Sequence, residues 1–153
     1  MKKKIWKLLF WAYLALLFLV VILKFRGSFR ELIERSAIEP LGQNYNLIPF
    51  ATLRVQLRYL HATWARFNLV GNTVPFLPFG CLLPIAYRKA GSLGKVLLLG
   101  LLFVLMAEAV QFYTNLGSFD VDDILLNMAA IFVGYLPVGI AGILRKTKSK
   151  KKK

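Results

Sequence analysis

Apolar residues along this chain are gathered in four long runs, each about as long as a membrane-spanning helix. A helix needs about 20 mostly apolar residues to cross the hydrocarbon core of a bilayer. The runs cover about 6–24, 69–87, 95–114 and 123–144. The pattern therefore predicts an all-α integral membrane protein with four transmembrane helices, and we expect a single domain over residues 1–153.

The first run follows a basic N-terminus, an arrangement that signal peptides also have. However, no small-residue cleavage site closes the run, which ends at Lys24, Phe25 and Arg26. We therefore expect an uncleaved membrane anchor.

The second run contains helix-breaking residues at five positions: Gly71, Pro75, Pro78, Gly80 and Pro84. A proline inside a helix removes one backbone hydrogen bond and clashes with the preceding turn. Because lipid cannot satisfy exposed backbone groups, such a segment must lie against other helices or a polar cavity. We expect Pro75 and Pro78 to break this helix, with the freed carbonyls facing the layer of polar residues described below.

The loop 25–68 between the first two runs carries two amphipathic stretches. The first, "SFRELIERSAIE", opens with a capping box formed by Ser28 and Glu31. The second covers 51–67, where five apolar residues recur at helical spacing: Leu53, Leu57, Leu60, Trp64 and Phe67. Both predict helices lying on the outer leaflet. Alternatively, the loop is a lid whose arginines contact anionic headgroups, the candidates being Arg54, Arg58 and Arg66.

Basic residues set the expected orientation. The chain has 21 Lys and Arg against 7 Asp and Glu, a formal net charge of +14. Fourteen of the 21 basic residues lie in the N-terminal segment, the 88–95 turn and the tail 145–153, while the turn 115–122 has none. Cytoplasmic loops are rich in Lys and Arg, so both termini are predicted to be cytoplasmic. Because the basic runs flank apolar runs, we interpret them as membrane-orienting and expect no nucleic-acid partner.

Four polar residues of the apolar runs fall at one depth below the outer face: Asn72, Glu108, Gln111 and Asn127. Gln111 and Glu108 share a helix face, roughly 5 and 9 Å below that surface. We call these four residues the polar layer. An ionisable group inside a span usually faces the bundle interior and is paired or hydrated. The layer is therefore expected to be either a ligand pocket or a set of hydrogen bonds that joins the helices.

The stretch "FDVDDILLN" at 119–127 places three aspartates above the polar layer. Acidic residues at a helix N-terminus are favoured by its dipole, and Asp120 is a candidate N-cap. The aspartates could also bind Mg²⁺, with Asp120 and Asp123 as ligands, or a cationic or sugar ligand, or pair with the loop arginines. Helical spacing places Asp123 on the inward face with Asn127 and turns Asp122 toward the loop or water, so Asp122→Asn is expected to be mild.

Four stretches together resemble the VanZ-like family of small bacterial membrane proteins. They are "NLIPF" at 46–50, "GNTVPFLPFG" at 71–80, "EAVQF" at 108–112 and "FDVDDILLN" at 119–127. Through these motifs, the resemblance assigns family polar positions to Asn46, Pro49, Asn72, Pro78, Gly80, Glu108, Gln111, Asp120, Asp123 and Asn127. The chain departs from the family where "NLGS" at 115–118 lacks an arginine and where Ala130 replaces a glycine.

The resemblance implies a role at the outer face of the bacterial cell membrane. The family is named for a protein associated with resistance to teicoplanin, a lipid-tailed glycopeptide antibiotic. We expect a binding or modulating protein without a cofactor, whose ligand-binding residues would be Asn72, Glu108, Gln111, Asp120, Asp123 and Asn127. Its expected partners are membrane lipids and a lipid-linked cell-wall precursor or lipoglycopeptide.

Two alternatives stay open at this point. One is an integral-membrane enzyme acting on a lipid-linked phosphate or sugar, in which Asp120 and Asp123 hold Mg²⁺ and Glu108 acts as general base, so that Glu108 and Asp123 are its candidate catalytic residues. The chain offers little else to such an enzyme, because it has one histidine, His61, and one cysteine, Cys81. The other alternative is a structural assembly partner whose polar layer only joins helices.

Overall fold

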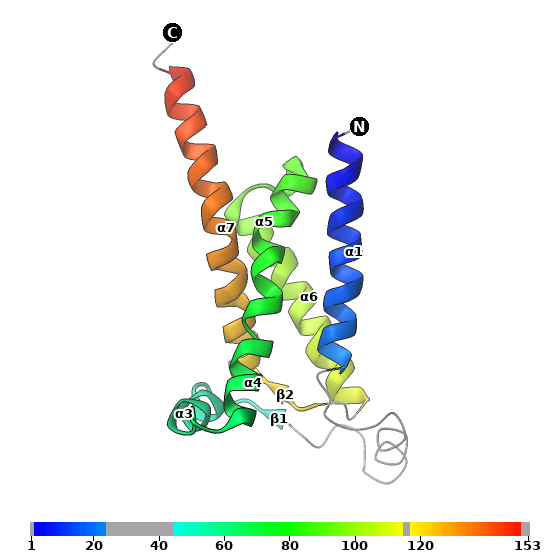
Figure 1. The fold of residues 1–153 in the computed structure, drawn as a ribbon, viewed down its shortest axis with the longest axis vertical. Coiled ribbons are helices and arrows are strands. Elements are labelled where there is room, and N and C mark those ends of the chain that lie inside the picture. The colour runs from blue at the N-terminus through cyan, green and yellow to red at the C-terminus, as the bar shows by residue number, and fades with distance from the viewer. Residues whose placement is uncertain (1, 24–44, 115–116, 151–153) are drawn as a thin grey trace.

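Four apolar helical segments run side by side along the long axis of the molecule (Figure 1). The computed structural model describes residues 2–23, 45–114 and 117–150. Within these ranges, four segments are long and apolar enough to cross a membrane: Lys4–Val21, Thr63–Ala86, Leu93–Tyr113 and Val121–Gly142. The predicted all-α architecture with four spans is therefore confirmed. The helix expected from Ser28 onward lies outside the described residues.

The long helices are α1 (Lys2–Leu23), α6 (Leu93–Tyr113) and α7 (Val121–Lys150). The shorter ones are α3 (Ala51–Arg58), α4 (Thr63–Gly71) and α5 (Leu77–Ala86), with 3-10 turns η1 (Val74–Phe76) and η2 (Arg88–Ala90). The N- and C-terminal ends lie at one end of the bundle, which we call the terminal end. At the opposite end, the loop end, α3 lies beside two short strands, β1 (Tyr45–Asn46) and β2 (Phe119–Asp120).

The second span is interrupted, as its prolines predicted. It consists of α4, the turn η1 and α5, and it starts at Thr63 rather than near residue 69. The carbonyl of Pro75 accepts a hydrogen bond from the hydroxyl of Tyr13 on α1, at 2.7 Å. A freed backbone group is therefore satisfied by a neighbouring helix. The partner, Tyr13, lies outside the polar layer, so the expectation that the freed carbonyls face the layer is wrong for Pro75.

Glycines bring α5 and α7 into backbone contact. A Cβ atom on Gly80 of α5 would overlap the carbonyl oxygen of Ile131, and one on Gly134 of α7 would overlap the carbonyl oxygen of Leu77. Small residues allow this close approach between helices in a membrane. Although Ala130 stands where the family resemblance expects a glycine, α7 still packs closely through Gly134, one turn later. A Cβ on Gly100 of α6 would lie 2.7 Å from the side chain of Ile131, so α6 joins the same contact.

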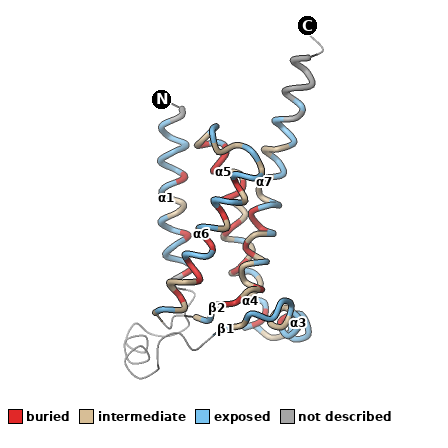
Figure 2. The backbone as a smooth tube through the Cα atoms, turned by 180° about the vertical axis from the view of Figure 1, so that it is seen from behind, coloured by how far each residue is buried: buried red, intermediate tan, exposed pale blue. Residues whose placement is uncertain are grey.

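The buried residues lie mainly on α5, α6 and the loop-end half of α7, while α1 and the following part of α7, up to Leu144, are mostly exposed where the structure describes them (Figure 2). Their apolar core includes Phe76, Phe79, Val96, Val104 and Ile131. Many exposed side chains are apolar as well, among them Leu16, Leu98 and Ile140. An apolar outer surface around a satisfied helical backbone suits a lipid environment.

The β pairing is the part of the fold that the hydrophobic pattern did not predict. β1 and β2 run parallel, with Tyr45 opposite Phe119 and Asn46 opposite Asp120. The predicted amphipathic stretch 51–67 is also two helices, α3 and α4, separated by a turn at 59–62. The short pairing joins the loop before α3 to the segment that leads into α7.

We predict that Gly134→Ala lowers the free energy of unfolding by about 1–3 kcal/mol, because the added methyl group forces α7 away from α5. Gly142→Ala is the matched control on the same helix, since a Cβ there meets no atom within 4 Å. The measurement is the thermal unfolding of both variants in one detergent. Equal stability of the two variants would contradict the close contact at Gly134.

Candidate functional site

All four residues of the predicted polar layer are buried inside the bundle. Asn72 follows the last turn of α4, Glu108 and Gln111 lie on α6, and Asn127 lies on α7. Each is less than a tenth exposed. Three helical segments thus contribute polar side chains at the loop-end half of the bundle, as expected from their depths.

The layer is tied to its surroundings through backbone groups. The side-chain amide of Gln111 donates to the carbonyl of Val21, near the end of α1, at 3.0 Å. Glu108 Oε2 accepts the backbone N–H of Asp120 at 3.3 Å. Asn127 Oδ1 is buried and accepts no hydrogen bond from any described residue. An unfilled buried acceptor is uncommon in native proteins and indicates capacity for a water molecule or a ligand donor.

Asp120 is the centre of a hydrogen-bond network that holds the loop before α3. Its Oδ1 accepts from the side-chain amide of Asn46 at 3.2 Å and from the backbone N–H of Asp122 at 2.9 Å. Its Oδ2 accepts from the hydroxyl of Thr52 at 2.6 Å. Asn46 also donates to Thr52 Oγ1, so the three side chains form a closed set. Both oxygens of this carboxylate are therefore engaged by donors from the protein.

Asp122 caps the start of α3. Its carboxylate accepts the backbone N–H of Phe50 at 2.5 Å through Oδ1 and that of Leu53 at 2.9 Å through Oδ2. It lies in the first turn of α7 and against the first turn of α3, so two helix N-termini favour its negative charge. Phe50, which precedes α3, has a left-handed backbone with φ of 66°. For a bulky residue this conformation is strained and persists only where its surroundings enforce it.

These contacts revise the interpretation of the acidic cluster. Asp122 does turn toward the loop, as predicted, but it is only 1% exposed. The expectation that its replacement is mild does not fit a buried carboxylate that accepts two backbone hydrogen bonds. Asp123 is only partly buried. The cluster therefore contains two carboxylates that fasten segment 46–53 to α7.

The other proposed roles of the aspartates find less support. Hydrogen bonds that Asp120 and Asp122 accept from described residues come from amide, hydroxyl and backbone donors, and none comes from an arginine. Arg54, Arg58 and Arg66 are exposed. No group of three or more His, Cys, Asp or Glu side chains that could hold a metal ion occurs among the described residues. With both oxygens already accepting hydrogen bonds, Asp120 is a poor candidate for a Mg²⁺ ligand.

Sequence reasoning missed two polar residues of α3. Thr52 donates to Asp120, and Gln56 is only 2% exposed. Gln56 Oε1 accepts no hydrogen bond within the part of the chain that the structure describes. Their spacing of four residues places them on one helix face, about 100° around the helix from Leu53 and Leu57, and this spacing could have identified them. That stripe is exposed at Leu57 and Leu60, as expected for a helix lying at a membrane surface.

An apolar groove of about 560 Å³ lies beside the polar layer, between α1 and α4. Its walls include Val20 of α1, Phe67 and Val70 of α4, and Val74 and Pro75 of the following turn. The groove also contacts Thr63 and Arg66, near the start of α4. Arg66 is the charged residue of the groove lining. The lining also includes Gly71, which directly precedes the buried Asn72 of the polar layer. We call this the outer groove, after the orientation expected from the basic residues.

The VanZ/LLP1 family model matches residues 10–142. Among curated proteins, Protein VanZ of Enterococcus faecium is 32% identical over 88 residues, which are 56% of this chain and 50% of that protein. The chain thus matches about half the length of this relative. No solved structure matches the chain.

We predict that Asp122→Asn loosens α3 from α7, because an amide group replaces one of the two oxygens that accept backbone hydrogen bonds. The local opening of α3 should become about 2 kcal/mol easier, or roughly thirtyfold more frequent. Trypsin should then cleave faster after Arg54 and Arg58, while cleavage after Arg88 and Lys89 in the same digest serves as the internal control. Unchanged cleavage in α3 would contradict its capping by Asp122.

Proposed function

This chain belongs to the VanZ/LLP1 family, and on that premise we propose that it is a cell-membrane protein that binds a lipid-tailed anionic ligand at the loop end. The single observation that carries the proposal is the outer groove, which combines an apolar wall with Arg66. Lipid-tailed phosphates and lipoglycopeptides combine an apolar chain with a polar head. The ligand would place its tail against Phe67, Val70 and Val74 and its head near Arg66.

The polar layer supports this proposal. Gln111 binds the carbonyl of Val21, the residue after Val20 of the groove, and Asn72 follows Gly71 of the groove. The groove therefore lies one residue away from the layer on both walls. Asn127 adds a buried acceptor within the layer that could receive a hydroxyl or amide donor. If the layer served only to join helices, we would expect the Asn127 acceptor to receive a hydrogen bond from another residue of the described chain.

The 46–53 segment would act as the cover of the layer. Asp120 and Asp122 hold this segment across the start of α7 through Asn46, Thr52 and the first turn of α3. The exposed apolar residues of the cover and of α3, Ile48, Phe50 and Leu57, would lie in the headgroup region of the bilayer. Because both carboxylates serve the cover, binding rather than catalysis is the role that the geometry supports best.

The proposed setting is the outer leaflet of the bacterial cell membrane. Both termini lie at the end opposite to α3 and carry basic clusters, which favours a cytoplasmic terminal end. The loop end would then face outward, where lipid-linked cell-wall precursors and glycopeptide antibiotics occur. By the family resemblance, we propose that binding there influences resistance to teicoplanin-type antibiotics.

We predict that an impermeant maleimide applied to intact cells labels Ser118→Cys and not Ser92→Cys, both in a Cys81→Ser background. The two serines are exposed at opposite ends of the bundle, one in the turn before α7 and one before α6. As a control, the maleimide should label Ser92→Cys once the cells are permeabilised, which would show that this cysteine is reactive. The opposite pattern would place the outer groove in the inner leaflet and overturn the proposed setting.

We predict that the purified protein retains polyprenyl phosphate in native mass spectrometry and that Arg66→Gln lowers this retention about fivefold, the effect of one cation near a membrane surface. Val74→Trp, which fills the groove, should abolish retention. Ile140→Trp is the control on the exposed face of α7. If all three variants retain the lipid as the parent protein does, the outer groove is not its binding site.

A further inference from the structure

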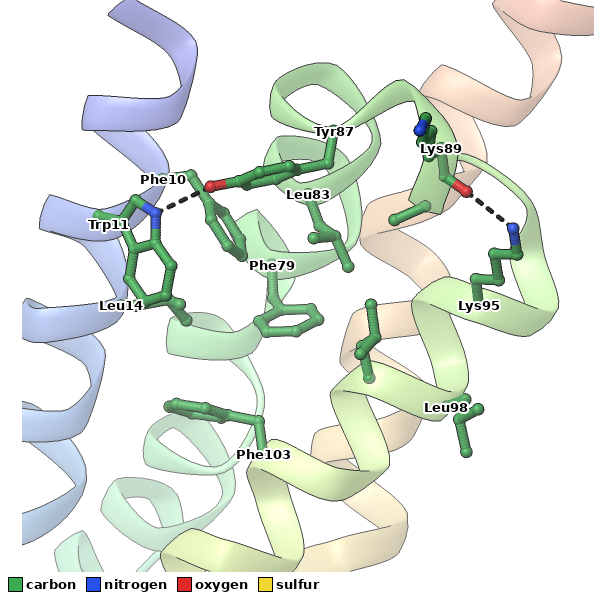
Figure 3. Close-up of a pocket in the computed structure, with 12 residues that line it drawn as sticks. Phe10, Trp11, Leu14, Phe79, Leu83, Tyr87, Lys89, Lys95, Leu98 and Phe103 are labelled. Atoms are coloured by element: carbon green, nitrogen blue, oxygen red, sulfur yellow. Dashed lines mark hydrogen bonds between the residues drawn. The ribbon is translucent and has the colours of Figure 1, made fainter. Parts of the chain in front are cut away.

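A second apolar groove, of about 580 Å³, lies at the terminal end of the bundle between α1, α5 and α6 (Figure 3). Its apolar wall includes Phe10, Leu14, Phe79, Leu83, Leu98 and Phe103. It also contacts Lys89 of η2 and Lys95 of α6. Nothing in the proposed function uses this groove, which is lined by none of the polar-layer residues. We call it the inner groove.

The rim of the inner groove is held by specific hydrogen bonds. The indole N–H of Trp11 donates to the hydroxyl of Tyr87 at 2.8 Å, which joins α1 to the end of α5. The ammonium group of Lys95 donates to the carbonyl of Lys89 at 2.9 Å. Figure 3 shows the first contact at one side of the rim and the second at the other. This second hydrogen bond holds the ammonium group of Lys95 at the rim of the groove.

Positive charge gathers at this rim. Lys89 and Lys95 are exposed, and the ammonium group of Lys7 lies 5.1 Å from the centre of the Tyr87 ring. An ammonium group has three donors, so the hydrogen bond to Lys89 leaves Lys95 with capacity for a phosphate. The helices that form the groove contain one carboxylate, Glu108, which is thirteen residues from Lys95 on α6. That separation is roughly 20 Å along the helix.

We propose that the inner groove binds an anionic phospholipid of the surrounding bilayer. An acyl chain would lie along Phe10, Phe79 and Leu98, and the phosphate would contact Lys89 and Lys95. Basic pockets between membrane helices are suited to anionic headgroups, and the aliphatic stems of lysines extend along apolar surface while their charges reach the interface. A second copy of this chain fits the groove poorly, because each copy carries a net charge of +14.

The test is native mass spectrometry of the full chain in detergent with an equimolar mixture of phosphatidylglycerol and phosphatidylcholine. The parent protein should retain phosphatidylglycerol in preference. The double variant Lys89→Gln/Lys95→Gln should lower the retained phosphatidylglycerol roughly thirtyfold, the effect of two cations near a membrane surface. Lys148→Gln/Lys150→Gln removes the same charge from the C-terminal tail and should retain phosphatidylglycerol like the parent.

A second pair of variants separates the groove from its charge. Leu99→Trp should fill the groove and displace the lipid, whereas Leu102→Trp lies on the same helix outside the lining and should not. Three outcomes would each overturn the proposal. The parent protein could retain the two lipids equally, Lys148→Gln/Lys150→Gln could lose as much phosphatidylglycerol as Lys89→Gln/Lys95→Gln, or a dimer of the chain could appear in place of the lipid complex. Arg66→Gln leaves the inner groove intact, so failure at this site is distinguishable from failure at the outer groove.

Discussion

The loop end depends on two buried carboxylates that accept hydrogen bonds from a segment about seventy residues earlier in the chain. Asp120 binds the side chains of Asn46 and Thr52, and Asp122 binds backbone N–H groups at the start of α3. A buried carboxylate is costly unless it is fully hydrogen-bonded. The segment and the start of α7 therefore stabilise each other, and in the proposed function they cover the polar layer.

Below this closure, the packing of α5, α6 and α7 sets the depth of the polar layer. Gly80 and Gly134 allow α7 to contact the backbone of α5, and Ile131 lies against Gly100 of α6. Asn127 is one helical turn from Ile131, so the same contact places its side chain among the three helices. The contacts of Asp120 and Asp122 before Asn127 and the contact of Gly134 after it thus hold the same helix, α7, on either side of Asn127.

The first helix packs differently and borders both grooves. Val20 of α1 lines the outer groove, while Phe10, Trp11 and Leu14 line the inner one. Each groove joins an apolar wall to cationic residues at its own end, with Arg66 at the loop end and Lys89 and Lys95 at the terminal end. The same combination of aliphatic wall and cation would accommodate a lipid in either leaflet, while the neighbouring polar layer distinguishes the outer groove.

Local sequence determined the spans, the break in the second span and the burial of the polar layer. Each of these features depends on one stretch of the chain: a long apolar run, the proline at position 75, or the helical spacing of Glu108 and Gln111. They can therefore be recognised without knowing which segment packs against them. The family motifs added the candidate positions of the loop end. The prediction that the second span breaks and the prediction of four spans were both correct for this reason.

Only the tertiary structure decided the hydrogen bonds of Asp122 and Thr52 and the burial of Gln56. Helical spacing gave the direction of Asp122, but not the start of α3 that lies in that direction. The parallel pairing of β1 with β2 and both grooves likewise arise between segments far apart in the chain. A hydrogen-bond acceptor or an apolar wall has the same local sequence whether or not a partner lies opposite, and folding alone brings that partner into contact.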